Sequence, residues 1–134
     1  GALIEQASHL SVAEHPHDPM KEAFGTLICL WRLERNLSAD KLAELADIDP
    51  EEIEYIEQDE AYRPEPRTVC ALANVMKVPE IKLLQLSGNA VTEDPGLAEH
   101  SYAFAANAKR WQQISREQRK LLRSYLKYLA NHRP

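Results

Sequence analysis

The chain has 134 residues, of which 44% are hydrophobic, and a formal net charge of -5, so it can form one compact domain with additional segments but not two full-sized domains. Four glycines and few alternating β-branched runs favour helices, and we expect an all-α fold. No run approaches ~18 apolar residues and no basic segment precedes an apolar core at the N-terminus, so we expect a cytoplasmic protein without a membrane span or secretory signal.

The charge is distributed unevenly along the chain. Residues 1–100 hold twenty acidic and eight basic side chains, whereas residues 101–134 hold one acidic and eight basic side chains. The two parts are therefore electrostatically complementary. Either they dock on each other, within or between subunits, or the basic tail binds a different anionic partner.

The first segment, residues 1–19, is expected to form an N-terminal arm, because two prolines interrupt its helical pattern. Three histidines and an aspartate lie within residues 9–18, but their short, proline-broken spacing is not that of a tetrahedral metal site. Cys29 and Cys70 stand alone in apolar helical patterns and are expected to be buried. We therefore expect no metal and no cofactor.

Residues 20–87 carry the signals of five consecutive helices. Asn36 ends the first helix, because Asn tolerates a left-handed C-terminal conformation, and Ser38 can cap the second. The third has a strong start, with Asp49 as N-cap, Pro50 at the first position and acidic residues near the positive end of the helix dipole. The first predicted helix spans Met20 to Arg35, the second follows the Ser38 cap, the third begins at Asp49-Pro50, the fourth includes Val69 to Met76, and the fifth runs from Pro79 to Leu86.

The faces of the second and third helices follow from the spacing of their apolar residues. Leu42, Leu45 and Ala46 are expected to form the inner face of the second helix, and Ile53 anchors the third. Asp47 lies where a tight turn is needed between the two helices.

Residues 88–100 are expected to be a linker, on their content of Gly, Pro, Asn, Thr and Asp, and residues 101–134 a basic helical extension. A helix from about Ser101 to Gln113 precedes a final helix, whose start has the capping-box spacing of Ser115 and Gln118.

This last helix has an apolar side opposite a basic side. We expect the apolar side to bury against a second subunit and so to form a homodimer. Two other roles remain open, a second nucleic-acid contact and a membrane-surface helix, although the latter usually needs Trp or Phe at the interface. The candidate dimerisation residues are Leu122, Tyr125, Leu126 and Leu129.

The order and spacing of residues 22–87 resemble the phage-repressor-like, Cro-type (XRE) helix-turn-helix family. The residues that carry the resemblance include Phe24-Gly25, Ile28, Trp31-Arg32, Leu37-Ser38, Leu42-Ala43, Ile48, Ile53, Ile56-Glu57, Pro64, Leu72-Ala73, Val78 and Leu83-Leu84. The resemblance implies a five-helix domain, with Leu37–Ala46 as scaffold helix and Asp49–Gln58 as recognition helix, that usually works as a dimer on DNA. It also implies a structural ion pair between Arg32 and Glu57.

The chain departs from the family pattern where DNA would be bound. Between Asp47 and Glu60 it carries eight carboxylates and no Lys or Arg, although neutralisation of phosphate supplies most non-specific affinity for DNA. Direct readout would depend on Glu accepting from cytosine N4 and on apolar contacts. The candidate DNA-binding residues are Ser38, Ala39, Lys41, Asp49, Pro50, Glu51, Glu52, Glu54, Tyr55, Arg63 and Arg67.

Two functions follow from these observations. The first is a DNA-binding transcriptional regulator with an unusually acidic recognition helix. The alternative is a protein-interaction regulator, of the antitoxin or anti-repressor type, whose acidic face binds a basic protein partner. We do not expect an enzyme, since the chain has no set of nucleophile and base, no Gly-rich phosphate loop and no metal cluster.

Overall fold

The computed structural model describes residues 18–108 and 113–131, and within these residues the chain is all-helical, with seven α-helices and no strand. This confirms the predicted fold class. Most of the arm predicted for residues 1–19 lies outside the described residues. The helices are α2 (Pro19–Glu34), α3 (Ala39–Ala46), α4 (Pro50–Gln58), α5 (Pro66–Met76), α6 (Glu80–Leu86), α7 (Pro95–Asn107) and α8 (Arg116–Asn131).

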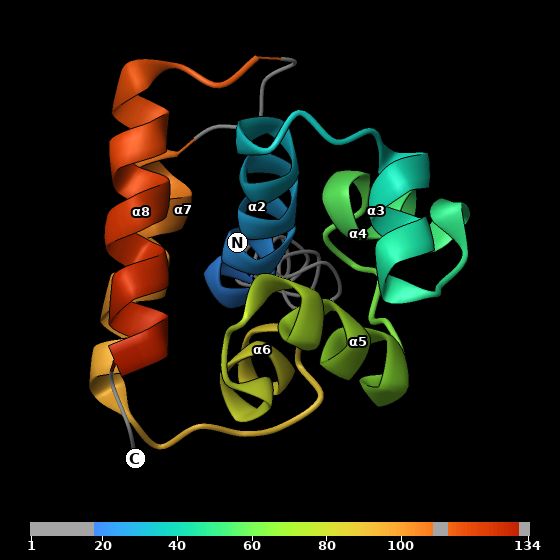
Figure 1. Cartoon of the computed structure of the whole chain (residues 1–134). Helices are drawn as coiled ribbons and strands as arrows, with labels where there is room; N and C mark the ends of the chain where they lie inside the picture. Colours follow the sequence, from blue (N-terminus) through green and yellow to red (C-terminus); the bar gives the residue numbers. More distant parts are fainter. Residues whose placement is uncertain (1–17, 109–112, 132–134) are drawn as a thin grey trace, which may run out of the picture.

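Helix α2 runs through the middle of the molecule and packs against α4, α6, α7 and α8. In Figure 1, α3 and α4 lie on one side of α2, α7 and α8 lie on the other, and α5 and α6 lie below. A single apolar core joins all of these helices, because amphipathic helices of this length are stabilised mainly by burying their apolar faces. Among the described helices, none combines the length and the apolarity needed to cross a bilayer.

The helix boundaries follow local signals in the sequence. Asn36 and Asp47 adopt the left-handed conformation, with φ of 57° and 58°, and end α2 and α3 as their residue types predict. Lys77 also has a left-handed φ, of 60°, after α5. This turn could not be predicted from the residue type, since Lys rarely adopts the left-handed conformation.

Three helices start with the same Asp-Pro pair. The Asp side chain accepts a hydrogen bond from the backbone N–H two residues later at Asp18, Asp49 and Asp94, at 3.0, 2.9 and 2.9 Å. Proline loses nothing at the first helical position, because its missing N–H would have no partner there. The linker predicted for residues 88–100 is therefore wrong from Pro95 onward, since that residue begins α7 and its Asp-Pro-Gly sequence is a helix start.

The last helix packs within its own chain. The capping box is formed, with Ser115 N–H donating to Gln118 Oε1 at 2.9 Å and Gln118 N–H donating to Ser115 Oγ at 3.1 Å. The Tyr125 ring stacks on Phe104 of α7 with centroids 4.3 Å apart, and its hydroxyl lies 2.6 Å from Ser101 Oγ. These contacts fix α8 against α7.

The expectation that the apolar side of α8 faces a second subunit is wrong for three of its four residues. Leu122, Tyr125 and Leu129 are buried against helices of the same chain, and Leu126 is half-buried. The reason is that α2 and α7 already offer an apolar surface to α8, so the helix does not need another subunit to cover it.

Helix α7 is also attached to the preceding helices by charge. Lys82 of α6 is almost fully buried, and its Nζ lies 4.0 Å from Asp94 Oδ2 at the start of α7. A buried cation is costly without an opposite charge nearby, so this contact places the start of α7 beside α6.

Candidate nucleic-acid interface

Helices α3 and α4 form a compact pair joined by the turn at Asp47. Ser38 caps α3, with its Oγ accepting from Lys41 N–H at 3.0 Å, and Asp49 caps α4. Leu42 of α3 and Ile53 of α4 are buried in the core. The buried sides hold the two helices together and leave the start of α4 exposed to solvent.

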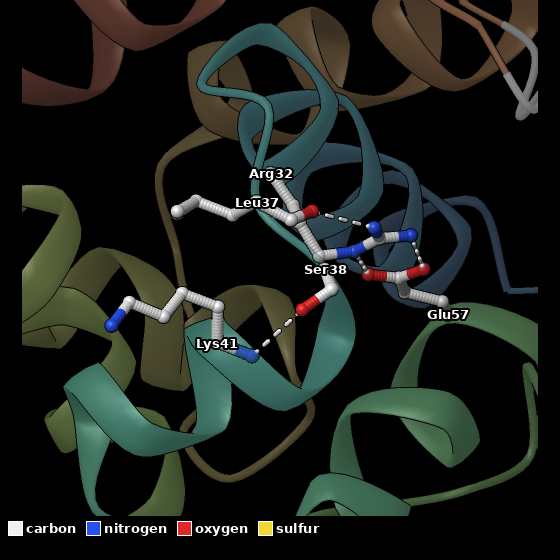
Figure 2. Close-up of polar contacts among 5 residues, drawn as sticks. All are labelled: Arg32, Leu37, Ser38, Lys41 and Glu57. Carbon is white, nitrogen blue, oxygen red and sulfur yellow. Dashed lines mark hydrogen bonds and ion pairs between the residues drawn. The ribbon is translucent and has the colours of Figure 1, made fainter.

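Arg32 and Glu57 fix α4 to α2. Arg32 Nε donates to Glu57 Oε2 and Arg32 Nη2 donates to Glu57 Oε1, both at 2.9 Å (Figure 2). Arg32 Nη1 donates to the backbone oxygen of Leu37, also at 2.9 Å. The hydrogen bonds to Glu57 raise the pKa of Arg32, although burial opposes them. One guanidinium thus connects α2, α4 and the segment before α3, and it sets the orientation of α4 in the domain.

Glu52 also has an internal role. Its carboxylate accepts hydrogen bonds from the Tyr62 hydroxyl at 3.0 Å and from Thr68 Oγ1 at 3.1 Å. Burial and, after it, the hydrogen bond to Glu52 raise the pKa of Tyr62 to about 12, so this hydroxyl remains a donor at neutral pH. Glu52 was expected among the base-reading residues, but its side chain ties α4 to the following loop and to α5.

The acidic character of α4 is therefore partly structural. Glu57 pairs with a cation, Glu52 accepts from two hydroxyls, and Asp49 caps α4. Asp59 caps the turn that follows, by accepting from the Ala61 N–H at 2.9 Å. Four of the eight carboxylates between Asp47 and Glu60 thus have partners within the chain. These partners explain why an acidic or polar residue stands at each position, without a contact to DNA or to another protein.

The exposed residues of α4 are Pro50, Glu51, Glu54, Tyr55 and Gln58. The Tyr55 side chain is 50% exposed, and its ring lies 5.2 Å from that of Tyr62. This surface offers two carboxylates and one amphipathic ring. It contains no cation.

Leu45 was expected in the core and is instead 51% exposed. The inner face of α3 is formed by Leu42, Ala43 and Ala46, because the small Ala43 allows the neighbouring helix to approach closely. Leu45 is thus an apolar side chain on the outer surface of the α3–α4 pair.

The cations expected at this interface are few. At the start of α3, Ser38 and Lys41 are exposed and Ala39 is half-buried. Lys41 is paired with a carboxylate, because its Nζ lies 2.8 Å from Glu44 Oε1. Arg63 and Arg67 are exposed in the loop before α5 and at its start. Arg67 lines a cavity of about 640 Å³ together with Asp47, Asp49 and Glu52, so its positive charge is offset by neighbouring carboxylates.

The sequence did not predict the partners of Glu52, because no local pattern connects residues on α4, the loop and α5. Only the packing of these elements brings Tyr62 and Thr68 to the same carboxylate.

Comparison with known proteins supports the arrangement described above. A family model described as Helix-turn-helix matches residues 30–83, from the last part of α2 into α6. No curated protein and no solved structure matches the chain.

Proposed function

We propose that the chain is a transcriptional regulator that binds DNA through α3 and α4, because residues 30–83 belong to the Cro-type (XRE) helix-turn-helix family. The observation that carries this proposal is the exposed start of α4, held by the Arg32–Glu57 ion pair and the Ser38 and Asp49 caps. In helix-turn-helix proteins the N-terminal part of the second helix contacts base edges in the major groove.

The proposed contacts divide by chemistry. Pro50 and Tyr55 provide apolar contacts to thymine methyl groups, and Glu51 and Glu54 accept hydrogen bonds from cytosine N4. Ser38, with Lys41, Arg63 and Arg67, contacts phosphates and positions the domain without reading the sequence. Three cations per chain are few, and we expect weak non-specific binding.

A dimer fits this proposal, because two-fold symmetric regulators bind two half-sites about one helical turn apart. The interface of such a dimer would have to lie outside Leu122, Tyr125 and Leu129, which are buried within the chain.

The proposal is tested by selecting binding sites from a randomised duplex library with the full chain, followed by anisotropy titrations of the enriched duplex over a salt series. We expect one enriched motif. With three phosphate-binding cations per chain, the logarithm of the binding constant should fall with the logarithm of salt with a slope of about -3 for each chain bound. A library that shows no enrichment would contradict the proposal.

A second function is favoured by the apolar and acidic side chains exposed together on the α3–α4 pair. Leu45 and Tyr55 are each about half exposed, and Glu51 and Glu54 are exposed on α4. Such a combination suits a basic protein surface with an apolar centre. Failure of the DNA selection, together with binding of an arginine-rich peptide that is lost in a Leu45→Ala, Tyr55→Ala variant, would support this alternative.

A further inference from the structure

A groove lies between the end of α2, the end of α5 and the outer part of α8. Its volume is about 620 Å³, within the range of small-molecule sites. None of the candidate DNA-binding residues lines it. The lining residues are Trp31, Glu34, Arg35, Met76, Lys77, Val78, Arg123, Leu126, Lys127 and Ala130.

The rim of the groove is positively charged. Its four cations come from three different segments, and the lining contains one carboxylate, Glu34. Glu34 is shared, with Arg35 Nη1 at 3.5 Å and Arg123 Nε at 2.8 Å. Lys77 and Lys127 have no acidic partner within the described part of the chain. The groove therefore carries a charge of about +3, from four cations and one anion.

Helix ends explain part of this charge. Arg35 and Lys77 are the C-caps of α2 and α5, where cations favourably meet the negative end of a helix dipole. Arg123 and Lys127 lie in the middle and later part of α8, and no helix end requires them there. Their presence on the same groove is the part of the pattern that indicates a ligand.

The floor of the groove is formed by apolar side chains that are largely buried. Met76 and Val78 are buried, and Trp31 is 3% exposed with the Arg35 guanidinium carbon 4.3 Å from its ring centroid. Trp31 Nε1 is buried and has no hydrogen-bond acceptor among the described residues. A buried indole N–H usually finds an acceptor, and none of the described residues supplies one here.

We propose that this groove binds a small organic anion with an apolar body and two acidic groups. The bound anion would connect the helix-turn-helix region to α8. The apolar body would lie on Trp31 and Met76, and the acidic groups would meet Lys77 and Lys127. A small molecule fits better than a nucleic acid or an acidic peptide, because the cations come from three separate segments that meet at one small groove. The proposal does not depend on DNA binding.

The test uses phenylsuccinate as the anionic probe and its neutral diamide as the matched control. The chain has two tryptophans, Trp31 and Trp111, so a Trp111→Phe variant leaves a single indole N–H signal in a nitrogen-15 NMR spectrum. We expect phenylsuccinate to shift this signal saturably and the diamide to leave it unchanged.

Two matched variants of the full chain locate the site. Lys77→Gln with Lys127→Gln should weaken phenylsuccinate binding at least tenfold at an unchanged melting temperature, because both lysines are exposed and without an acidic partner in the described structure. Arg119→Gln with Lys120→Gln removes two exposed cations of α8 outside the groove and should leave the affinity within twofold. The proposal is overturned by an absence of saturable shift, by equal binding of the diamide, or by tighter binding of a glutamate-rich peptide with none of phenylsuccinate.

Discussion

Glu51 and Glu52 are neighbours in the first turn of α4 with different surroundings. Glu51 is exposed and its carboxylate accepts no hydrogen bond from the described residues, whereas Glu52 is half-buried and accepts from Tyr62 and Thr68. Both carboxylates face the positive end of the same helix dipole. The difference between them therefore isolates the internal hydrogen bonds.

We predict that Glu52→Gln lowers the free energy of unfolding by about 1 kcal/mol more than Glu51→Gln, because hydrogen bonds to an ionised acceptor are stronger than those to an amide. Urea unfolding of the two variants measures this difference. Equal midpoints for both would show that the contacts of Glu52 contribute nothing to stability.

The Arg32–Glu57 pair gives a second prediction at this scale. The side chains are 17% and 9% exposed, so removing either one leaves a largely desolvated charge. Each single Ala substitution should cost about 3 kcal/mol, at the lower end of the range for buried pairs. The double substitution should cost much less than the sum, as a double-mutant cycle in urea would reveal.

Lys41→Ala is the control, because Lys41 belongs to an exposed ion pair with Glu44, and it should leave the unfolding curve unchanged. Melting curves for Arg32→Ala and Glu57→Ala that match the parent would remove the structural role given to the pair.

The sequence predicted the helix starts that depend on residues close together in the chain. It did not predict the features that depend on how the helices pack against one another. The predicted starts at Ser38, Asp49 and Ser115 agree with the structure, because a cap depends on residues close together in the chain. Leu45 was assigned to the core from its spacing alone. Which side of α3 is buried depends on where the neighbouring helices pack, and spacing does not show this. The docking of α8 on α2 and α7 could not be predicted for the same reason.

The outward carboxylates of α4 should limit its affinity for phosphate. We predict that Glu51→Gln with Glu54→Gln raises affinity for a random duplex several-fold at low salt, since two negative charges near the phosphates are removed. Glu52 is left unchanged in this variant because of its internal contacts.

The matched control removes two exposed carboxylates elsewhere, through Glu93→Gln and Glu99→Gln near and within α7. Anisotropy titrations should show no comparable gain for this control. An equal gain for both variants would indicate that only the overall charge matters, and no gain for either would show that α4 does not approach DNA.

For the whole molecule, α7 and α8 complete the core of the helix-turn-helix region. Leu97 and Leu129 are fully buried, and both helices pack on α2. The arrangement differs from the helical extension behind a linker that the composition of residues 88–100 predicted. Helix α8 lies across α2 from α4 (Figure 1), and Arg123 of α8 forms an ion pair with Glu34 of α2 at 2.8 Å.

Deleting residues 113–134 should therefore destabilise the remaining domain, because it uncovers apolar surface on α2 and α7. We expect a lower melting temperature and increased binding of a hydrophobic dye, and circular dichroism and dye fluorescence measure these changes. A truncated chain that melts like the full one would show that α8 is an independent appendage, as the sequence suggested. Light scattering of both chains would show whether α8 also affects the oligomeric state.

The central claim is that DNA meets the α3–α4 surface and not the basic side of α8. The most direct measurement is an anisotropy titration of the enriched duplex with two variants that each lose two exposed cations, Lys41→Gln with Arg67→Gln and Arg119→Gln with Lys120→Gln. The first should bind at least about tenfold more weakly and reduce the magnitude of the salt slope by about 2, and the second should bind like the parent. The opposite result, with loss of binding only in the α8 variant, would contradict the claim and place the nucleic acid on α8.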